Sequence, residues 1–129
     1  MIVIDASAAV EVFIKSPLGV RHESRVLTTT RHAPHLINVE LVQALRRFVS
    51  SGAVATRIAE EALNDFQSAA LDLHVHDPLL PRVWELRTSL SAYDALYVAL
   101  AETLDAPLLT CDGRLSRSHG HNARIELLT

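Results

Sequence analysis

The amino-acid sequence predicts an α/β fold, a three-layer α/β/α sandwich with a parallel sheet of about five strands. Short apolar segments with the composition of strands alternate with helical segments along the whole chain, and short connections join them. One helical segment, Ala92–Leu104, is apolar on nearly every side, as expected for a helix that is buried within a domain. We therefore expect residues 1–129 to form one domain with helices on both faces of its sheet.

The strand predictions rest on short segments that are continuously apolar or that alternate. Ile2–Ile4 is rich in β-branched residues, which suits a strand that is buried on both faces. Leu71, Leu73 and Val75 occupy every second position, so they would share one face of a strand. Because helices separate the strands, we expect them to pair in parallel. The predicted strands are Ile2–Ile4, Ala33–Ile37, Leu71–Val75, Pro107–Thr110 and Arg124–Leu128.

Apolar residues at helical spacing mark the segments between these strands. Asn38 is a good N-cap for the amphipathic helix that follows it. Asp77 and Pro78 supply a cap and a first-turn proline for another helix. The predicted helices are Ala6–Ile14, Gly19–Leu27, Val39–Val49, Thr56–Ala69, Leu79–Leu90, Ala92–Leu104 and a short one near Arg114.

The composition limits the partners and the compartment of the protein. Apolar residues make up 49% of the chain and aromatic residues only 5%, so the core must be aliphatic. The formal net charge of −3 does not favour a polyanionic partner, so nucleic-acid binding would have to be local or mediated by a cation. The single cysteine, Cys111, excludes an intrachain disulfide and fits a reducing compartment. With no signal peptide and no apolar run of membrane-spanning length, we expect a cytoplasmic protein with no membrane partner.

Four acidic residues follow the predicted strands or begin the helices next to them: Asp5, Glu40, Asp94 and Asp112. Each also has a purely structural interpretation, because Ser91-x-x-Asp94 fits a capping box and Asp112-Gly113 fits a turn or an N-cap. The carboxyl ends of parallel strands, however, meet at one edge of the sheet, where the active sites of such folds lie. We therefore expect the four carboxylates to lie close together.

Clustered carboxylates repel one another, so without a cation some of them would hold protons and their pKa values would rise. A hard divalent cation removes this repulsion, and a site of oxygen ligands with positions left for water suits Mg²⁺ or Mn²⁺. A bound cation would also attract phosphate groups, which explains how an acidic pocket could hold a polyanion. A pair of ions about 4 Å apart would activate water and stabilise the leaving oxygen in phosphodiester cleavage.

Four motifs at these positions resemble PIN-domain nucleases. They are D-A-S at Asp5–Ser7, N-V-E-L at Asn38–Leu41, Y-D-A-L-Y-V-A-L-A at Tyr93–Ala101 and L-L-T-C-D at Leu108–Asp112. In length and spacing the whole chain is similar to the VapC toxins of bacterial toxin–antitoxin modules. The resemblance implies a compact α/β/α sandwich and a Mg²⁺- or Mn²⁺-dependent endoribonuclease. It also implies three partners, namely an RNA substrate, a small antitoxin protein and a second copy of the chain.

The same resemblance implies roles for individual acids. The catalytic acidic site would consist of Asp5, Glu40, Asp94 and Asp112. Asp5 and Asp94 would be the firmest metal ligands. Glu40 and Asp112 would complete the set of ligands or act through water.

Residues around the acids have implied roles as well. The hydroxyls of Ser7 and Thr110 would orient the carboxylates. Cys111, directly before the last acid, is a mild departure from the family pattern, and no role follows for it. The arginines that would contact RNA phosphates are Arg114 and Arg117, and also Arg46 or Arg47. Each of them could instead be an ordinary solvated surface residue.

The sequence alone leaves other functions open. A phosphotransfer protein would use Asp5 or Asp94 as a phosphoryl acceptor, but such proteins need a lysine near the phosphate, and Lys15 is the only lysine. A catalytically inactive module of the same fold would only bind a partner, although retention of all four acids argues against it. His74 and His76 would share one face of a strand and could bind zinc, but no third ligand has suitable spacing.

Overall fold

The structure, a computed structural model, describes residues 1–129 and contains a five-stranded sheet with the strand order β3-β2-β1-β4-β5. All neighbouring strands pair in parallel, which confirms the predicted sheet. The first strand is central, and the Asp5 amide that follows it donates to the carbonyl of Leu109 at 3.1 Å. The strands are β1 (Ile2–Ile4), β2 (Arg31–Pro34), β3 (Leu71–His74), β4 (Leu108–Thr110) and β5 (Ile125–Leu127).

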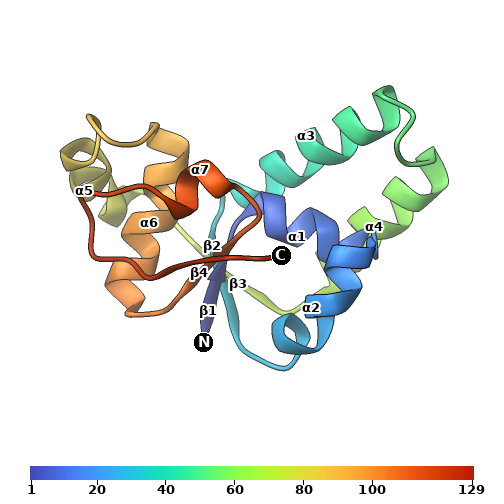
Figure 1. Cartoon of the computed structure of the whole chain (residues 1–129), viewed down its shortest axis with the longest axis horizontal. Coiled ribbons are helices and arrows are strands. Elements are labelled where there is room, and N and C mark those ends of the chain that lie inside the picture. Colours follow the sequence, from blue (N-terminus) through green and yellow to red (C-terminus); the bar gives the residue numbers. More distant parts are fainter.

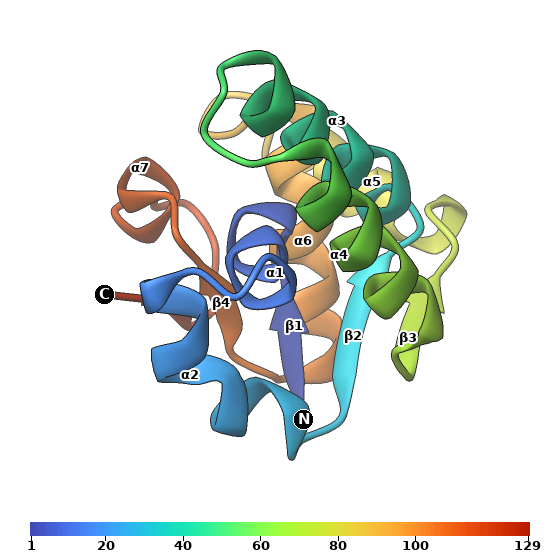
Figure 2. The ribbon, with the colours of Figure 1, turned by 90° about the vertical axis from the view of Figure 1, so that its right-hand side faces the viewer.

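Helices cover both faces of this sheet. In Figure 1, α1 to α4 lie on one side of the strands and α5 and α6 lie on the other. Figure 2 shows α1 in front of β1 and α6 behind it, so the predicted three layers are confirmed. The helices are α1 (Ala6–Phe13), α2 (Pro17–Leu27), α3 (Ile37–Ser50), α4 (Thr56–Ser68), the 3-10 helix η1 (Asp77–Leu79), α5 (Leu80–Glu85), α6 (Ala92–Leu104) and α7 (Gly113–Ser116).

The core is aliphatic, as the composition predicts. Of the 30 buried residues in the hydrophobic core, only Phe66 and Tyr97 are aromatic. Helix α6 has the bounds expected from the sequence, and every residue from Ala95 to Ala101 is buried. The Ser91 hydroxyl caps this helix by accepting a hydrogen bond from the Asp94 amide at 3.2 Å. The buried residues from Ala95 to Ala101 therefore hold α6 in the core, while the first turn of the helix lies at the carboxyl edge of the sheet. No helix is both long enough and apolar enough to span a lipid bilayer.

The second strand lies earlier than Ala33–Ile37, the range expected from the sequence. It spans Arg31–Pro34, and Ile37 instead begins α3, where its side chain is fully buried. The apolar pair before Asn38 therefore packs into the core from a helix, and apolar character alone does not distinguish the two states. Asn38 is not the N-cap, because it lies inside the first turn of α3 and Leu36 occupies the cap position without a side-chain hydrogen bond.

The segment predicted as one helix, Leu79–Leu90, is also shorter and divided. A 3-10 helix covers Asp77–Leu79, and α5 covers only Leu80–Glu85. Pro81 lies in the first turn of α5 and has no amide proton to continue a helical ladder from the preceding residues. Asp77 lies within the 3-10 helix and does not cap it with its side chain.

Candidate active site

The Asp5 carboxylate lies directly after β1 and is almost completely buried, with 7% of the residue exposed. Its Oδ1 accepts hydrogen bonds from the Ser7 hydroxyl at 2.6 Å and from the Ala8 amide at 3.0 Å. Its Oδ2 accepts a hydrogen bond from the Thr110 hydroxyl at 2.5 Å. Asp5 therefore caps α1, and two hydroxyl groups also fix the orientation of its carboxylate.

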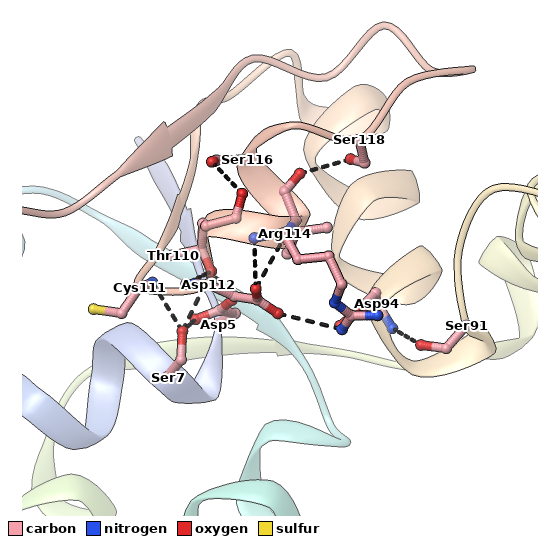
Figure 3. Close-up of polar contacts among 12 residues, drawn as sticks. Asp5, Ser7, Ser91, Asp94, Thr110, Cys111, Asp112, Arg114, Ser116 and Ser118 are labelled. Carbon is pink, nitrogen blue, oxygen red and sulfur yellow. Dashed lines mark hydrogen bonds and ion pairs between the residues drawn. The ribbon is translucent and has the colours of Figure 1, made fainter.

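Both hydroxyl groups are themselves oriented by the backbone that follows β4. The Cys111 amide donates to the Ser7 hydroxyl at 2.9 Å, and the Asp112 amide donates to the Thr110 hydroxyl at 3.0 Å. Each hydroxyl thus accepts from an amide after β4 and donates to one oxygen of Asp5 (Figure 3). This double connection joins the ends of β1 and β4, which are neighbours in the sheet. Cys111 contributes its backbone amide, a role that the sequence did not indicate.

Two further carboxylates, those of Asp94 and Asp112, flank the guanidinium group of Arg114. Asp112 caps the short helix α7 by accepting from the amides of Arg114 at 2.8 Å and Leu115 at 3.3 Å. The Nη2 atom of Arg114 lies 3.3 Å from Oδ2 of Asp94 and 3.3 Å from Oδ2 of Asp112. Figure 3 shows this arginine between the two acids, which come from the start of α6 and the end of β4.

Glu40 reaches the same region from the first turn of α3. Its Oε1 accepts a hydrogen bond of 2.6 Å from the hydroxyl of Tyr97, which lies on α6. Tyr97 follows Asp94 by three residues, so the two side chains lie on neighbouring positions of the helix surface. The sequence analysis missed Tyr97, although this spacing within the Y-D-A-L-Y motif was a signal that could have identified it.

The pKa values show that the four acids influence one another. Burial raises the pKa of Asp5, and the charge of Asp94 raises it further, although three hydrogen bonds oppose the change. Burial also raises the pKa of Glu40, with additional contributions from Asp5 and Asp94. The pKa of Asp94 is raised by burial and by Asp112, against the opposing charge of Arg114. The four carboxylates therefore lie near enough to one another, at the carboxyl edge of the sheet, for their charges to interact.

Asp112 differs from the other three acids. Its partial burial favours the protonated form, but the amides of Arg114 and Leu115 and the Arg114 side chain outweigh this effect. The pKa of Asp112 is consequently lowered, and its carboxylate stays charged more readily than those of its neighbours.

The residues of this site fit a hard divalent cation by their chemistry. All the candidate donors are carboxylate or hydroxyl oxygens, which suit Mg²⁺ or Mn²⁺. No group of three or more His, Cys, Asp or Glu side chains is arranged so that it could hold a metal ion. Mg²⁺ does not need such a cage, because in proteins it usually keeps several waters and binds one or two carboxylates.

The other residues selected from the sequence lie in several places. Arg117 is exposed and lines a pocket that also includes Asp94 and Arg114. Arg47 lines a different hollow, together with Glu40, whereas Arg46 is exposed and lines neither of them.

The two histidines considered for zinc have separate contacts. His74 approaches His32, with Nε2 and Nδ1 2.9 Å apart, whereas His76 accepts a hydrogen bond from the Leu36 amide at 3.0 Å. The side chain of Cys111 is equally unsuited to nucleophilic chemistry, because burial raises the pKa of its thiol to about 11.

Comparison with known proteins agrees with the fold. The sequence profile of the PIN domain matches residues 2–119. The chain is 41% identical over 128 residues to Ribonuclease VapC12 of Mycobacterium tuberculosis, covering 99% of each chain. It is 37% identical over 116 residues to VapC ribonuclease Mb0985 of Mycobacterium bovis, covering 90% of this chain and 89% of the relative.

Solved structures with low sequence identity share the fold. PAE2754 from Pyrobaculum aerophilum has a TM-score of 0.69 at 23% identity, over 95% of this chain and 81% of that one. VapBC2 from Rickettsia felis, bound to a DNA fragment from its promoter, gives a TM-score of 0.71 at 18% identity over 100% of both chains. The family profile and the curated relatives together establish that the chain belongs to the PIN-domain family, among the VapC ribonucleases.

Proposed function

We propose that the protein is a Mg²⁺-dependent endoribonuclease, with Mn²⁺ as a possible substitute, that acts as the toxin of a toxin–antitoxin pair. The observation that carries this proposal is the convergence of Asp5, Glu40, Asp94 and Asp112 at one edge of the sheet. The names of the curated relatives support RNA as the substrate. No relative supports the phosphotransfer alternative or an inactive module.

Asp5 and Asp94 are the residues that would hold the cation, and Glu40 and Asp112 would complete its surroundings directly or through water. When bound, the cation would lower the pKa of a water molecule and stabilise negative charge on the leaving oxygen of a phosphodiester. The hydroxyls of Ser7 and Thr110 would keep the Asp5 oxygens in position, since the carboxylate cannot rotate without breaking both hydrogen bonds. These assignments are part of the proposal.

Glu40 is the residue that would accept a proton from the attacking water. The Tyr97 hydroxyl donates a hydrogen bond to Oε1 of Glu40, whereas Oε2 accepts no hydrogen bond from the protein and is free to accept a proton. The pKa of Glu40 is raised by burial, which brings the carboxylate closer to the operating range of a general base. Arg114 would offset the repulsion between the charges of Asp94 and Asp112 and the incoming phosphate.

The proposal includes a small antitoxin protein as partner, a homodimeric toxin and a cytoplasmic location. The VapC names of the relatives and the fold shared with VapBC2 support the antitoxin. We expect expression without an antitoxin to arrest growth, because uncontrolled RNA cleavage would stop protein synthesis.

Incubation of the purified protein with total cellular RNA and Mg²⁺, followed by sequencing of the new RNA ends, tests this function. We expect discrete cleavage sites that are absent with the Asp94→Asn variant. A stable acyl phosphate after exposure to acetyl phosphate, without RNA cleavage, would instead establish the phosphotransfer alternative.

A further inference from the structure

A pocket of about 550 Å³ lies beside the acids, between the connection from α5 to α6 and the segment that runs from α7 into the following loop. Its lining is polar apart from Leu90 and Leu115, and three arginines dominate it. Asp94 is the only acid in the lining. The charged and titratable lining residues are Arg87, Asp94, Arg114, Arg117 and His119.

Arg87 is held in place on one wall of this pocket without a carboxylate partner. Its guanidinium carbon lies 4.5 Å from the centroid of the Trp84 ring, and Nη1 donates to the Trp84 carbonyl at 3.0 Å. None of the ion pairs of the protein includes Arg87. The positive charge of the stacked arginine is therefore not neutralised by a carboxylate of the protein. Its remaining N–H donors are also free to bind an anion.

Arg117 supplies a second unpaired charge from the other segment that lines the pocket. It is exposed, forms no ion pair, and lies over Gly113, where an added Cβ would come within 3.1 Å of its Nη1. The absence of a side chain at Gly113 thus gives the guanidinium group of Arg117 its place next to the N-cap of α7. Arg114 already faces Asp94 and Asp112, so Arg87 and Arg117 carry the net positive charge of the pocket.

The two segments that line the pocket approach each other closely at Gly120 and Ser89. Gly120 has a φ of +87°, and a Cβ at this position would lie 2.9 Å from the Ser89 hydroxyl. Glycine permits both the left-handed backbone and the short approach. The loop after α7 therefore packs closely against the α5–α6 connection, and these are the two segments that carry Arg117 and Arg87.

We infer that this pocket binds a backbone phosphate of the RNA chain next to the scissile one, with Arg87 and Arg117 as its ligands. This inference rests on the proposed ribonuclease function. The protein has a net charge of −3 and acids at its catalytic centre, so its attraction for RNA must come from a local basic site. Two planar guanidinium groups in one pocket suit a phosphate, because each offers paired donors to its oxygens. Asp94 is part of the pocket lining, so a phosphate held in the pocket would place a neighbouring phosphodiester near the acids.

The test is the binding of a fluorescein-labelled, single-stranded RNA of mixed sequence to the full-length protein, measured by fluorescence anisotropy in EDTA over a range of salt concentrations. EDTA isolates phosphate contacts that need no cation and prevents cleavage. We expect Arg87→Gln and Arg117→Gln each to weaken binding roughly tenfold or more, as for a lost charge-assisted hydrogen bond. Each should also lower the slope of log Kd against log salt concentration by about 0.7.

Two further variants serve as controls. Arg57→Gln removes an exposed arginine on α4 that pairs with Glu61, and it should leave the Kd for RNA and the salt slope unchanged. Arg87→Lys keeps the charge above Trp84, so it should recover part of the affinity that Arg87→Gln loses. Circular dichroism melting of every variant checks that it is folded.

Wild-type affinity and salt slope in folded Arg87→Gln and Arg117→Gln proteins would overturn the pocket as a phosphate site. If the wild type still cleaved RNA in Mg²⁺ and Asp94→Asn did not, only this inference would be lost. A wild-type protein that neither bound nor cleaved RNA would remove the proposed function as well.

Discussion

The Tyr97 hydroxyl donates a hydrogen bond of 2.6 Å to Oε1 of Glu40, and this contact joins α6 to α3 across 57 residues of sequence. Tyr97 is only 2% exposed, so its ring fixes the hydroxyl position by packing. The hydrogen bond lowers the pKa of Glu40, while burial and the neighbouring acids raise it. Tyr97 is therefore a positioning residue that also adjusts the proton affinity of the carboxylate.

Replacement of Tyr97 by Phe tests this relationship with little change in volume. Loss of a hydrogen bond to a charged group costs about 1.5–3 kcal/mol, so we expect kcat to fall roughly tenfold or more. The pKa of Glu40 should rise, and the acidic limb of the pH–rate profile should move to higher pH. Tyr93→Phe is the matched control, because the Tyr93 side chain is exposed on the same helix and its hydroxyl makes no hydrogen bond. Wild-type rates and an unmoved profile for Tyr97→Phe would contradict this role.

Replacement of Asp94 by Asn should abolish RNA cleavage without unfolding the protein. Asp94 is half-buried in the first turn of α6, and Asn keeps the shape of the side chain but loses the charge needed to hold a cation. Expression of this variant should no longer arrest growth. Asp105→Asn at the other end of α6 is the control, since Asp105 only pairs with Arg124 at the surface. Toxicity equal to that of the wild type would refute the assignment of Asp94.

Thr110→Val should reduce both stability and activity. Thr110 is fully buried, and the substitution removes the donor to Asp5 and the acceptor for the Asp112 amide with almost no change in shape. An unsatisfied buried polar group costs about 1–3 kcal/mol, which urea unfolding can measure. Thr103→Val is a suitable control, because the Thr103 hydroxyl bonds only to a carbonyl of its own helix. An unfolding free energy and a cleavage rate equal to those of the wild type would show that the hydroxyl does not hold Asp5.

The crowded acids should make metal-free stability depend on pH. Burial raises the pKa of Asp94 above its ordinary value of 3.8 in the folded protein. The native state therefore holds a proton more tightly than the unfolded chain does, and its stability falls as pH rises from 3.8 through the folded pKa. The same sign applies to Asp5 and Glu40, whose pKa values are also raised. Above these folded pKa values all three acids are charged, and their contribution to the free energy of unfolding is at its lowest. In EDTA, the acid cluster should therefore destabilise the protein most near neutral pH.

Comparison of wild type with Asp94→Asn isolates this effect. Burial lowers the pKa of His32, which titrates with the opposite sign, so the difference in Tm is more informative than either curve alone. In EDTA we expect Asp94→Asn to melt at a higher temperature than the wild type, with a difference that grows between pH 4 and 7. Saturating Mg²⁺ should raise the Tm of the wild type and reduce the difference. A lower Tm for Asp94→Asn in EDTA would contradict the picture of crowded charges.

The sequence predicted the elements whose pattern is local. The nearly all-apolar segment of α6 has its predicted bounds, and the acids at the ends of β1 and β4 lie where the rule for parallel sheets places them. The start of α3 was misjudged, because Ile37 is equally compatible with a strand and with a buried helical turn.

The contacts that organise the candidate site depend on tertiary structure. The Thr110 hydroxyl meets Asp5 across 105 residues, and the Cys111 amide meets Ser7 across 104. The hydroxyls of Ser7 and Thr110 were expected to orient carboxylates, but neither their common target nor the amides that hold them can be deduced from spacing. The same holds for Arg87, whose place in the basic pocket depends on the early end of α5 and on its contact with Trp84.

The dependence of RNA cleavage on a divalent cation tests the central claim most directly. Purified wild-type protein should cut RNA in millimolar Mg²⁺ or Mn²⁺, lose this activity in EDTA and recover it when the cation is restored. Isothermal titration should show that Asp5→Asn and Asp94→Asn weaken binding of Mn²⁺ in the absence of RNA. Cleavage that persisted in EDTA, or Mn²⁺ binding that was unchanged in both variants, would contradict a cation held by the acids at this edge of the sheet.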